Sequence, residues 1–142
     1  MATYNGEKYI EKQLDSIRTQ TRIVDEVIIC DDRSTDGTVS MIQRYIQKYK
    51  LSNWSIFINE QNKGFIGNFF ATLKKVTGDV IFLSDQDDEW YKDKVEKMTN
   101  LMRQNENIQA LNSAVCLIDG EGREKEVIAK KGYCNANILH KA

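Results

Sequence analysis

The residues best suited to chemistry begin in the segment from Ile28 to Thr38, IICDDRSTDGT. Four of them, from Asp32 to Gly37, match positions one, three, five and six of an EF-hand calcium loop. The twelfth position of that loop requires a bidentate Glu and here holds Gln43, and the preceding β-branched run predicts a strand instead of a helix. The segment is therefore predicted to be a strand that ends in two carboxylates and turns into a helix at Ser34 or Thr35. Open α/β sheets bind ligands at such turns.

A second acidic cluster, SDQDDEW, follows the apolar run from Val80 to Leu83. The carboxyl ends of parallel strands lie at one edge of a sheet, so Asp31 and Asp32 should face the same cleft as Asp85, Asp87 and Asp88. Crowded carboxylates repel one another unless a cation offsets them, and a hard divalent ion such as Mg²⁺ or Mn²⁺ suits oxygen ligands. The alternative for any single Asp is that it caps the following helix.

Hydrophobic periodicity predicts the elements that would position these residues. Helices are expected over 7–20, from 34 or 35 to about 49, over 66–76 and over 95–102, and strands over 26–30, 54–58 and 80–83, with a hairpin from 114–118 to 127–128. Strands separated by single helices predict an α/β fold with a mostly parallel, Rossmann-like sheet and helices on both faces. Only Met1 precedes ATYNG, so we expect the first strand to be truncated.

Composition narrows the class of protein. The chain has 142 residues, which is enough for one domain, and its net charge of −1 comes from 20 basic and 21 acidic residues that are interspersed. No basic face favours nucleic acid, and no run approaches the ~20 apolar residues of a membrane-spanning helix. Without a signal peptide the chain is expected to be cytoplasmic. Its three cysteines are widely spaced, which favours reduced thiols over a disulfide framework.

Four motifs, in order and spacing, resemble a known family: ATYNGEKYIEKQLDSIRTQT, DEVIICDDRSTDGT, NKGFIGNF and GDVIFLSDQDDEW. The chain is similar to the nucleotide-binding half of family 2 inverting glycosyltransferases with the GT-A fold, in particular to the rhamnosyltransferase-like enzymes of bacterial surface polysaccharide assembly. The resemblance covers residues 1 to about 120, the donor-binding part of a single domain. Residues 121–142 are then expected to begin the acceptor-side region.

The resemblance implies roles for individual residues. It places Ala2, Thr3, Tyr4 and Glu7 at the base and ribose, and it makes Asp32 the acid that accepts a hydrogen bond from N3 of uracil or thymine. Packing and capping are the alternatives for Tyr4 and Asp32. Asp85 and Asp87 match the Asp-x-Asp motif, in which the first acid addresses ribose or metal and the second binds the metal. The remaining matches are Asp88 and Trp90 towards the donor sugar, and Lys63 and Asn68 near the donor.

The implied reaction is inverting transfer of a sugar from a UDP- or dTDP-linked donor to a glycan or lipid-linked acceptor, with Mn²⁺ or Mg²⁺ as cofactor. The family's general base would lie beyond Ala142, so we expect this chain to bind nucleoside diphosphate without transferring sugar. The enzyme would work in the cytoplasm or at the inner face of the plasma membrane. His140, the only histidine, has no Ser or Cys partner motif that would favour a triad.

Two departures from the family pattern stand out: Arg33 where a small residue is common, and Ser113 where relatives often carry an acid. Two other classes stay open. A nucleotidyltransferase could share the sheet and the metal, although ATYNGEKY is not the glycine-rich phosphate loop that such an enzyme normally carries. A sugar-nucleotide-binding protein without transferase activity is the other.

Overall fold

The structure is a computed structural model that describes residues 1–105, 107–119 and 123–128. The chain forms two compact units, Met1–Val95 and Glu96–Ala142, and each is considered by itself. Cys134, His140 and most of the predicted acceptor-side region lie outside the described residues. The candidate site belongs entirely to the first unit.

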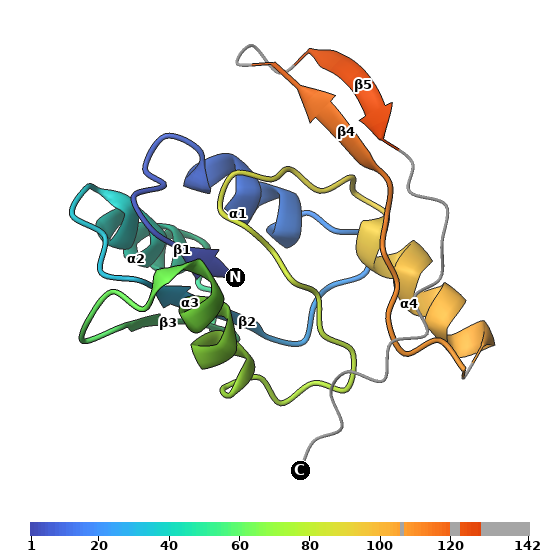
Figure 1. Cartoon of the computed structure of the whole chain (residues 1–142), viewed down its shortest axis with the longest axis horizontal. Helices are drawn as coiled ribbons and strands as arrows, with labels where there is room; N and C mark the ends of the chain where they lie inside the picture. The colour runs from blue at the N-terminus through green and yellow to red at the C-terminus, as the bar shows by residue number, and fades with distance from the viewer. Residues whose placement is uncertain (106, 120–122, 129–142) are drawn as a thin grey trace. The chain divides into compact units, whose positions relative to one another are not determined.

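A three-stranded parallel sheet forms the centre of the first unit (Figure 1). Its order is β1 (Ala2–Thr3), β2 (Val27–Asp31) and β3 (Trp54–Ile58), with Ala2 opposite Cys30 and Val27 opposite Trp54. The central strand β2 is the predicted apolar run, and four of its five residues are buried. A strand covered on both faces needs such a continuous apolar sequence, which confirms its predicted place in the sheet.

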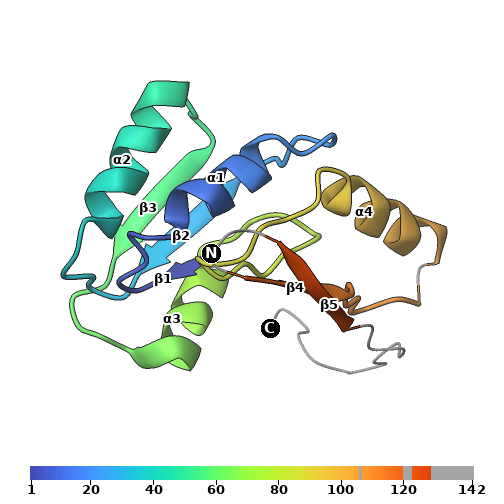
Figure 2. The same cartoon turned by 90° about the horizontal axis from the view of Figure 1, so that it is seen from above.

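Helices cover both faces of this sheet, as predicted (Figure 2). Helices α1 (Ile10–Arg18) and α2 (Thr38–Tyr49) lie on one face, and α3 (Gly64–Leu73) lies on the other. The apolar stripe of α1 is buried at Ile10, Leu14 and Ile17. These side chains pack with Ile29 of β2 and Ile42 of α2 in the hydrophobic core. The α/β class follows directly from alternating strands and amphipathic helices.

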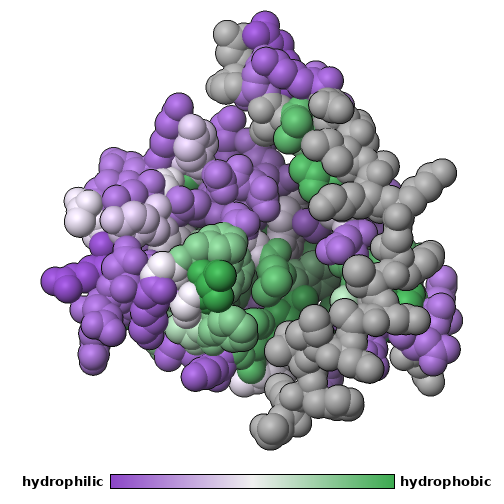
Figure 3. All heavy atoms as spheres, in the orientation of Figure 1, coloured by the Kyte–Doolittle hydropathy of each residue, from purple (hydrophilic) through white to green (hydrophobic). Residues whose placement is uncertain are grey.

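Helix α3 is oriented opposite to an ordinary amphipathic helix. Its buried residues are polar, Asn68 and Thr72, one helical turn apart, whereas Phe65, Ile66 and Phe70 are 68%, 68% and 56% exposed. Figure 3 shows a hydrophobic patch on the surface at the position that α3 has in Figure 1. The buried face of α3 therefore serves hydrogen bonding to the strands, which the site below makes use of.

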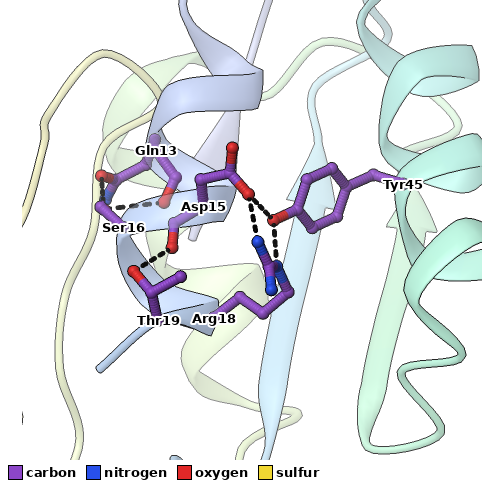
Figure 4. A network of polar contacts seen from close by, with 6 residues as sticks. All are labelled: Gln13, Asp15, Ser16, Arg18, Thr19 and Tyr45. Carbon is purple, nitrogen blue, oxygen red and sulfur yellow. Dashed lines mark hydrogen bonds and ion pairs between the residues drawn. The ribbon is translucent and has the colours of Figure 1, made fainter. Parts of the chain in front are cut away.

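A polar network joins α1 to α2 (Figure 4). The hydroxyl of Tyr45 donates to a carboxylate oxygen of Asp15 and accepts from Nε of Arg18 at 2.8 Å, and Arg18 also pairs with Asp15 at 2.8 Å. The guanidinium of Arg18 lies 4.0 Å from the ring centroid of Tyr49. The two helices on this face are thus held by directional contacts as well as by packing.

The prediction of a buried central strand over Val80 to Leu83 is wrong. This segment is described and contains no strand, and Val80, Ile81 and Leu83 are 39%, 41% and 61% exposed. Its neighbour β1 offers only two residues, and one backbone hydrogen bond, from Ala2 N to Ser84 O at 3.3 Å, joins the two segments. A strand needs a partner of similar length to satisfy its backbone hydrogen-bonding groups, so an apolar run alone is not sufficient to form a strand.

The helix after the first acidic motif also begins later than predicted. Helix α2 starts at Thr38, because the hydroxyl of Ser34 donates to Asp31 instead of capping a helix. Helix α4 (Lys94–Gln104) begins at the last residues of the first unit and continues in the second. A hairpin of β4 (Val115–Ile118) and β5 (Glu124–Ile128) follows it. The pairing is antiparallel, which confirms the predicted hairpin.

Candidate functional site

A cleft of about 490 Å³ lies at the carboxyl ends of β1 and β2. Four segments form its wall: the start of the chain, Asp32 after β2, residues 62–68 at the start of α3, and the acidic loop at residues 85–87. Of the described residues, eleven line it: Ala2, Thr3, Tyr4, Asp32, Asn62, Gly64, Phe65, Asn68, Asp85, Gln86 and Asp87. The predicted convergence of the two acidic motifs on one edge is therefore present in the structure.

The two acids at the end of β2 have different surroundings. Asp31 is fully buried, and its carboxylate accepts hydrogen bonds from Thr3 Oγ1 at 2.9 Å and from the backbone and hydroxyl of Ser34 at 2.7 and 2.6 Å. It therefore shapes the turn. Asp32 lines the cleft at 2% exposure.

The Asp32 carboxylate is oriented by donors from beyond β3. Its Oδ1 accepts from Asn59 Nδ2 and from the backbone N of Lys63, both at 2.8 Å, and Oδ2 lies 3.0 Å from the same Lys63 nitrogen. Asn59 Nδ2 also lies 2.9 Å from Asn68 Oδ1, so α3 takes part in this network through its buried polar face. A carboxylate has about four acceptor positions, so these three contacts leave part of its acceptor capacity unused.

The other residues of the first acidic motif connect the loop after β1 to the loop after β2 by hydrogen bonds. The loop after β1 donates from Asn5 N to Ser34 Oγ at 2.8 Å and from Glu7 N to Asp36 Oδ2 at 3.1 Å. In return, Gly37 N donates to Glu7 Oε2 at 2.9 Å. Burial favours the neutral form of Asp36, but hydrogen bonds from Thr38 and Glu7 outweigh it and lower the pKa of this carboxyl. Asp36 and Glu7 thus hold the wall of the cleft in place.

Arg33 stands between these two groups of contacts. Its φ of 68° lies in the left-handed region that favours glycine, and its Nη1 donates to Glu60 O at 3.2 Å. The departure from the family pattern at Arg33 therefore coincides with a backbone conformation that glycine adopts without steric cost.

The second acidic loop is anchored by α1 and by the start of the chain. Gln13 Nε2 donates to Ser84 Oγ at 2.6 Å, which fixes the residue before Asp85. Gln86 exchanges two hydrogen bonds with the backbone of Tyr4, from Tyr4 N to Oε1 at 2.8 Å and from Nε2 to Tyr4 O at 2.9 Å. The flanking acids Asp85 and Asp87 are thereby presented at the cleft.

Electrostatics in this loop favour a positive ligand. Burial, together with the charges of Asp88 and Asp87, raises the pKa of Asp85 above its usual range. Burial and the charge of Asp87 likewise raise the pKa of Asp88, and the nearby Lys94 offsets only part of this rise. Carboxyls whose ionised forms are disfavoured by one another gain most from a bound cation.

The residues present fit a divalent ion that is shared with a ligand. Within the described parts of the chain, no three His, Cys, Asp or Glu side chains are grouped so that they could hold a metal ion by themselves. Asp85 and Asp87 supply hard oxygen donors at the cleft. Mg²⁺ and related ions are commonly held by one or two carboxylates together with substrate phosphates and water, so two acids meet this requirement.

Seven of the predicted site residues line the cleft: Ala2, Thr3, Tyr4, Asp32, Asn68, Asp85 and Asp87. The other four, Glu7, Lys63, Asp88 and Trp90, are not among the described residues that form its wall. Trp90 lies in the hydrophobic core at 8% exposure, with its ring 5.8 Å from that of Phe82. Lys63 takes part through its backbone, which donates to Asp32.

Three residues of the wall were not predicted: Asn62, Phe65 and Gln86, whereas Gly64 belongs to the loop and helix start that the resemblance places near the donor. Asn62, Gly64 and Phe65 all lie within the motif NKGFIGNF, and Gly64 has a left-handed φ of 69°, which glycine adopts without steric cost. Gln86 lies between two acids and has no sequence signal of its own.

Comparison with known proteins assigns the architecture. The family model described as "Glycosyl transferase family 2" matches residues 1–133. A dTDP-rhamnosyl transferase, RfbG, from Shigella flexneri is 37% identical over 131 residues, which are 89% of this chain and 45% of that protein. The chain thus spans about half the length of this curated relative.

Solved structures agree with the family match. TarS residues 1–349 from S. aureus, in complex with UDP-GlcNAc, align with a TM-score of 0.67 and 28% identity over 75% of this chain and 31% of that one. A mannosyltransferase from Pyrobaculum calidifontis, in complex with GDP-Man and Mn²⁺, aligns with a TM-score of 0.66 and 27% identity over 71% of this chain and 30% of that one. The chain belongs to glycosyltransferase family 2 and has the GT-A fold.

Proposed function

We propose that this chain forms the donor-binding part of a metal-dependent glycosyltransferase whose donor is a UDP- or dTDP-linked sugar. The observation that carries the proposal is the convergence of Asp32 with Asp85 and Asp87 on one cleft. RfbG is a dTDP-rhamnosyl transferase, and the two solved structures reported above contain UDP-GlcNAc and GDP-Man, the second together with Mn²⁺.

The base end of the donor would lie at Asp32 and Tyr4. Asp32 lines the cleft and keeps unused acceptor capacity, which suits an N–H of the base. Uracil and thymine carry a proton on N3, whereas cytosine N3 and adenine N1 are unprotonated acceptors that would face the carboxylate without a shared hydrogen. Tyr4 is 48% exposed at the cleft, so its ring is available to stack on the base.

The diphosphate end would lie at the acidic loop, where Asp87 and Asp85 would hold Mn²⁺ or Mg²⁺. A bound divalent ion would offset the charge of the departing nucleoside diphosphate during attack by the acceptor hydroxyl. Asp87 is exposed at the cleft and is the better direct ligand, whereas Asp85 is half-buried and oriented by its neighbours. Asp88 adds negative charge beside these ligands, since its charge contributes to the raised pKa of Asp85.

The acceptor in this proposal is a hydroxyl of a glycan or of a lipid-linked sugar, as in the assembly of cell-surface polysaccharide. Direct displacement at the anomeric carbon would invert its configuration and would need a carboxylate base to take the hydroxyl proton. The described helices include none long and apolar enough to cross a membrane.

The experiment that tests this proposal is calorimetry of UDP and dTDP with and without Mn²⁺, on the parent chain and on Asp87→Ala. Loss of a direct ligand should weaken Mn²⁺-dependent binding more than the roughly 10- to 100-fold that loss of an outer-shell partner costs. Asp85→Ala and Asp88→Ala should weaken it less. Asp25→Ala, which changes an exposed acid before β2, is the matched control. Equal and mild losses in all four variants would show that these acids only cap or solvate the fold.

A further inference from the structure

The carboxamide of Gln86 links two walls of the cleft that are 82 residues apart in sequence. Its Oε1 accepts from Tyr4 N at 2.8 Å, and its Nε2 donates to Tyr4 O at 2.9 Å, so both polar ends of the side chain are used. Gln86 stands between the two acids of the cleft, Asp85 and Asp87, and itself lines the wall. A neighbouring strand would form the same two hydrogen bonds with the backbone of Tyr4, but here the carboxamide of Gln86 forms them.

The loop that receives Gln86 is fitted to it at Gly6. A Cβ placed on Gly6 would lie 2.3 Å from Gln86 Oε1 and 2.5 Å from its Cδ, which is closer than real Cβ contacts. Any side chain at position 6 would therefore displace the carboxamide. The absence of a side chain at Gly6 is a steric requirement of this contact.

The same loop is rigidly held on its other side. Asn5 has a φ of 50° and is fixed by hydrogen bonds from its N to Ser34 Oγ and from Thr35 N to its Oδ1, both at 2.8 Å. Gly6 N donates to Thr38 Oγ1 at 2.8 Å, which ties the loop to the start of α2. The loop that Gln86 binds is therefore already fixed by other hydrogen bonds. The Gln86 contact consequently restrains the acidic loop.

We infer that Gln86 is a positioning residue that aligns the acidic loop with the Tyr4 wall and so couples divalent-metal binding to nucleotide binding. This inference rests on the proposed donor site. Without the two hydrogen bonds, Asp87 and Asp85 would no longer stand at a fixed place relative to the base end of the cleft. A ligand that spans both ends would then have to order the loop when it binds, at a cost in affinity.

The test uses the ratio of the UDP dissociation constants measured without and with Mn²⁺, in the parent chain, Gln86→Ala and Gln86→Met. Methionine keeps the length of the side chain but makes neither hydrogen bond, so it separates alignment from packing. We expect the ratio to fall about tenfold in both variants, which corresponds to the loss of roughly one net hydrogen bond. Gln43→Ala, at an exposed glutamine of α2, is the control and should leave the ratio unchanged.

A rescue pair tests whether Gly6 acts through Gln86. Gly6→Ala should lower the ratio by displacing the carboxamide, and Gly6→Ala combined with Gln86→Ala should be no worse than the single Gly6→Ala change. Multiplied effects in the double variant would contradict the contact, and an unchanged ratio in both Gln86 variants would overturn the inference. Thermal unfolding of each variant separates misfolding from misalignment. A parent chain that binds neither UDP nor dTDP with Mn²⁺ would instead refute the proposed function.

Discussion

The side-chain nitrogen of Asn59 lies 2.8 Å from Asp32 Oδ1 and 2.9 Å from Asn68 Oδ1, so one amide group orients two residues of the cleft wall. Asn59 is 9% exposed, and its backbone N donates to Asp31 O at 2.9 Å. The residue after β3 thus connects the end of β2 with the buried polar face of α3.

Asn59→Asp should destabilise the fold more than Asn59→Ala. Alanine removes the shared donor and leaves two acceptors short of a partner, which should cost about 1–3 kcal/mol. Aspartate adds a second carboxylate against Asp32, which accepts and cannot donate while it is ionised. Urea unfolding at pH 7 would measure both changes. If Asn59→Asp is as stable as the parent chain, the described network does not hold Asp32.

The acidic loop should make stability depend on pH in a defined direction. Raised pKa values of Asp85 and Asp88 mean that the folded state binds protons more tightly than the unfolded chain, whose Asp pKa is about 3.9. Their contribution to stability is therefore present below about pH 4 and is lost as pH rises through the raised pKa values. Asp85→Asn should become more stable relative to the parent chain over that rise.

Urea unfolding of the parent and Asp85→Asn chains from pH 3.5 to pH 7 would test this sign. A stability difference between the two that stays constant, or that falls with pH, would contradict the raised pKa. The affinity for Mn²⁺ should rise with pH over the same range, because protons compete with the cation for these carboxylates.

Tyr45→Phe should loosen the two helices on one face of the sheet. The change removes the hydroxyl that donates to Asp15 and accepts from Arg18, and we expect a cost of about 1–2 kcal/mol. The hydrogen bond from Tyr45 is the main reason that the pKa of Asp15 is lowered. The contribution of a lowered pKa is lost as pH falls, so the cost of Tyr45→Phe should shrink in acid. A cost that is the same at pH 7 and pH 3 would count against this network.

Ile29→Ala and Phe70→Ala should have very different effects on stability. Ile29 is fully buried in the central strand, so its truncation should cost about 2–5 kcal/mol by leaving a cavity. Phe70 is 56% exposed on the outer face of α3, and its truncation should change the free energy of unfolding by less than about 1 kcal/mol. Urea unfolding of the pair would check both values, and equal costs would contradict the orientation of α3.

These residues also show what the sequence could predict. The buried strand β2 and the alternating strand β3 follow from local patterns, because apolar and β-branched runs reflect burial directly. The run from Val80 to Leu83 has the same local signal and forms no strand, since pairing depends on a neighbour that the local pattern does not contain. For the same reason the outward face of α3 could not be predicted from its composition.

The cleft shows a similar division. The position of Asp32 follows from the rule that ligands lie at the carboxyl ends of parallel strands, whereas Asp85 and Asp87 lie on a loop that no strand precedes and that Gln13 and Gln86 hold in place. The structural roles of Asp31 and Asp36 depend on donors from other loops, and the Gln86 contact joins residues 82 positions apart. Tertiary contacts of that range have no signature in a single sequence.

The most direct test of the proposed donor site is calorimetry with UDP, dTDP, CDP and ADP in the presence of Mn²⁺, on the parent chain and on Asp32→Ala. We predict that the parent chain binds UDP and dTDP at least about tenfold more tightly than CDP and ADP, because among these four bases only uracil and thymine carry a ring N–H, at N3, that can donate to the Asp32 carboxylate. Asp32→Ala should lose this preference. Equal affinity of the parent chain for all four diphosphates, or a preference that survives in Asp32→Ala, would contradict the assignment of Asp32 to the base.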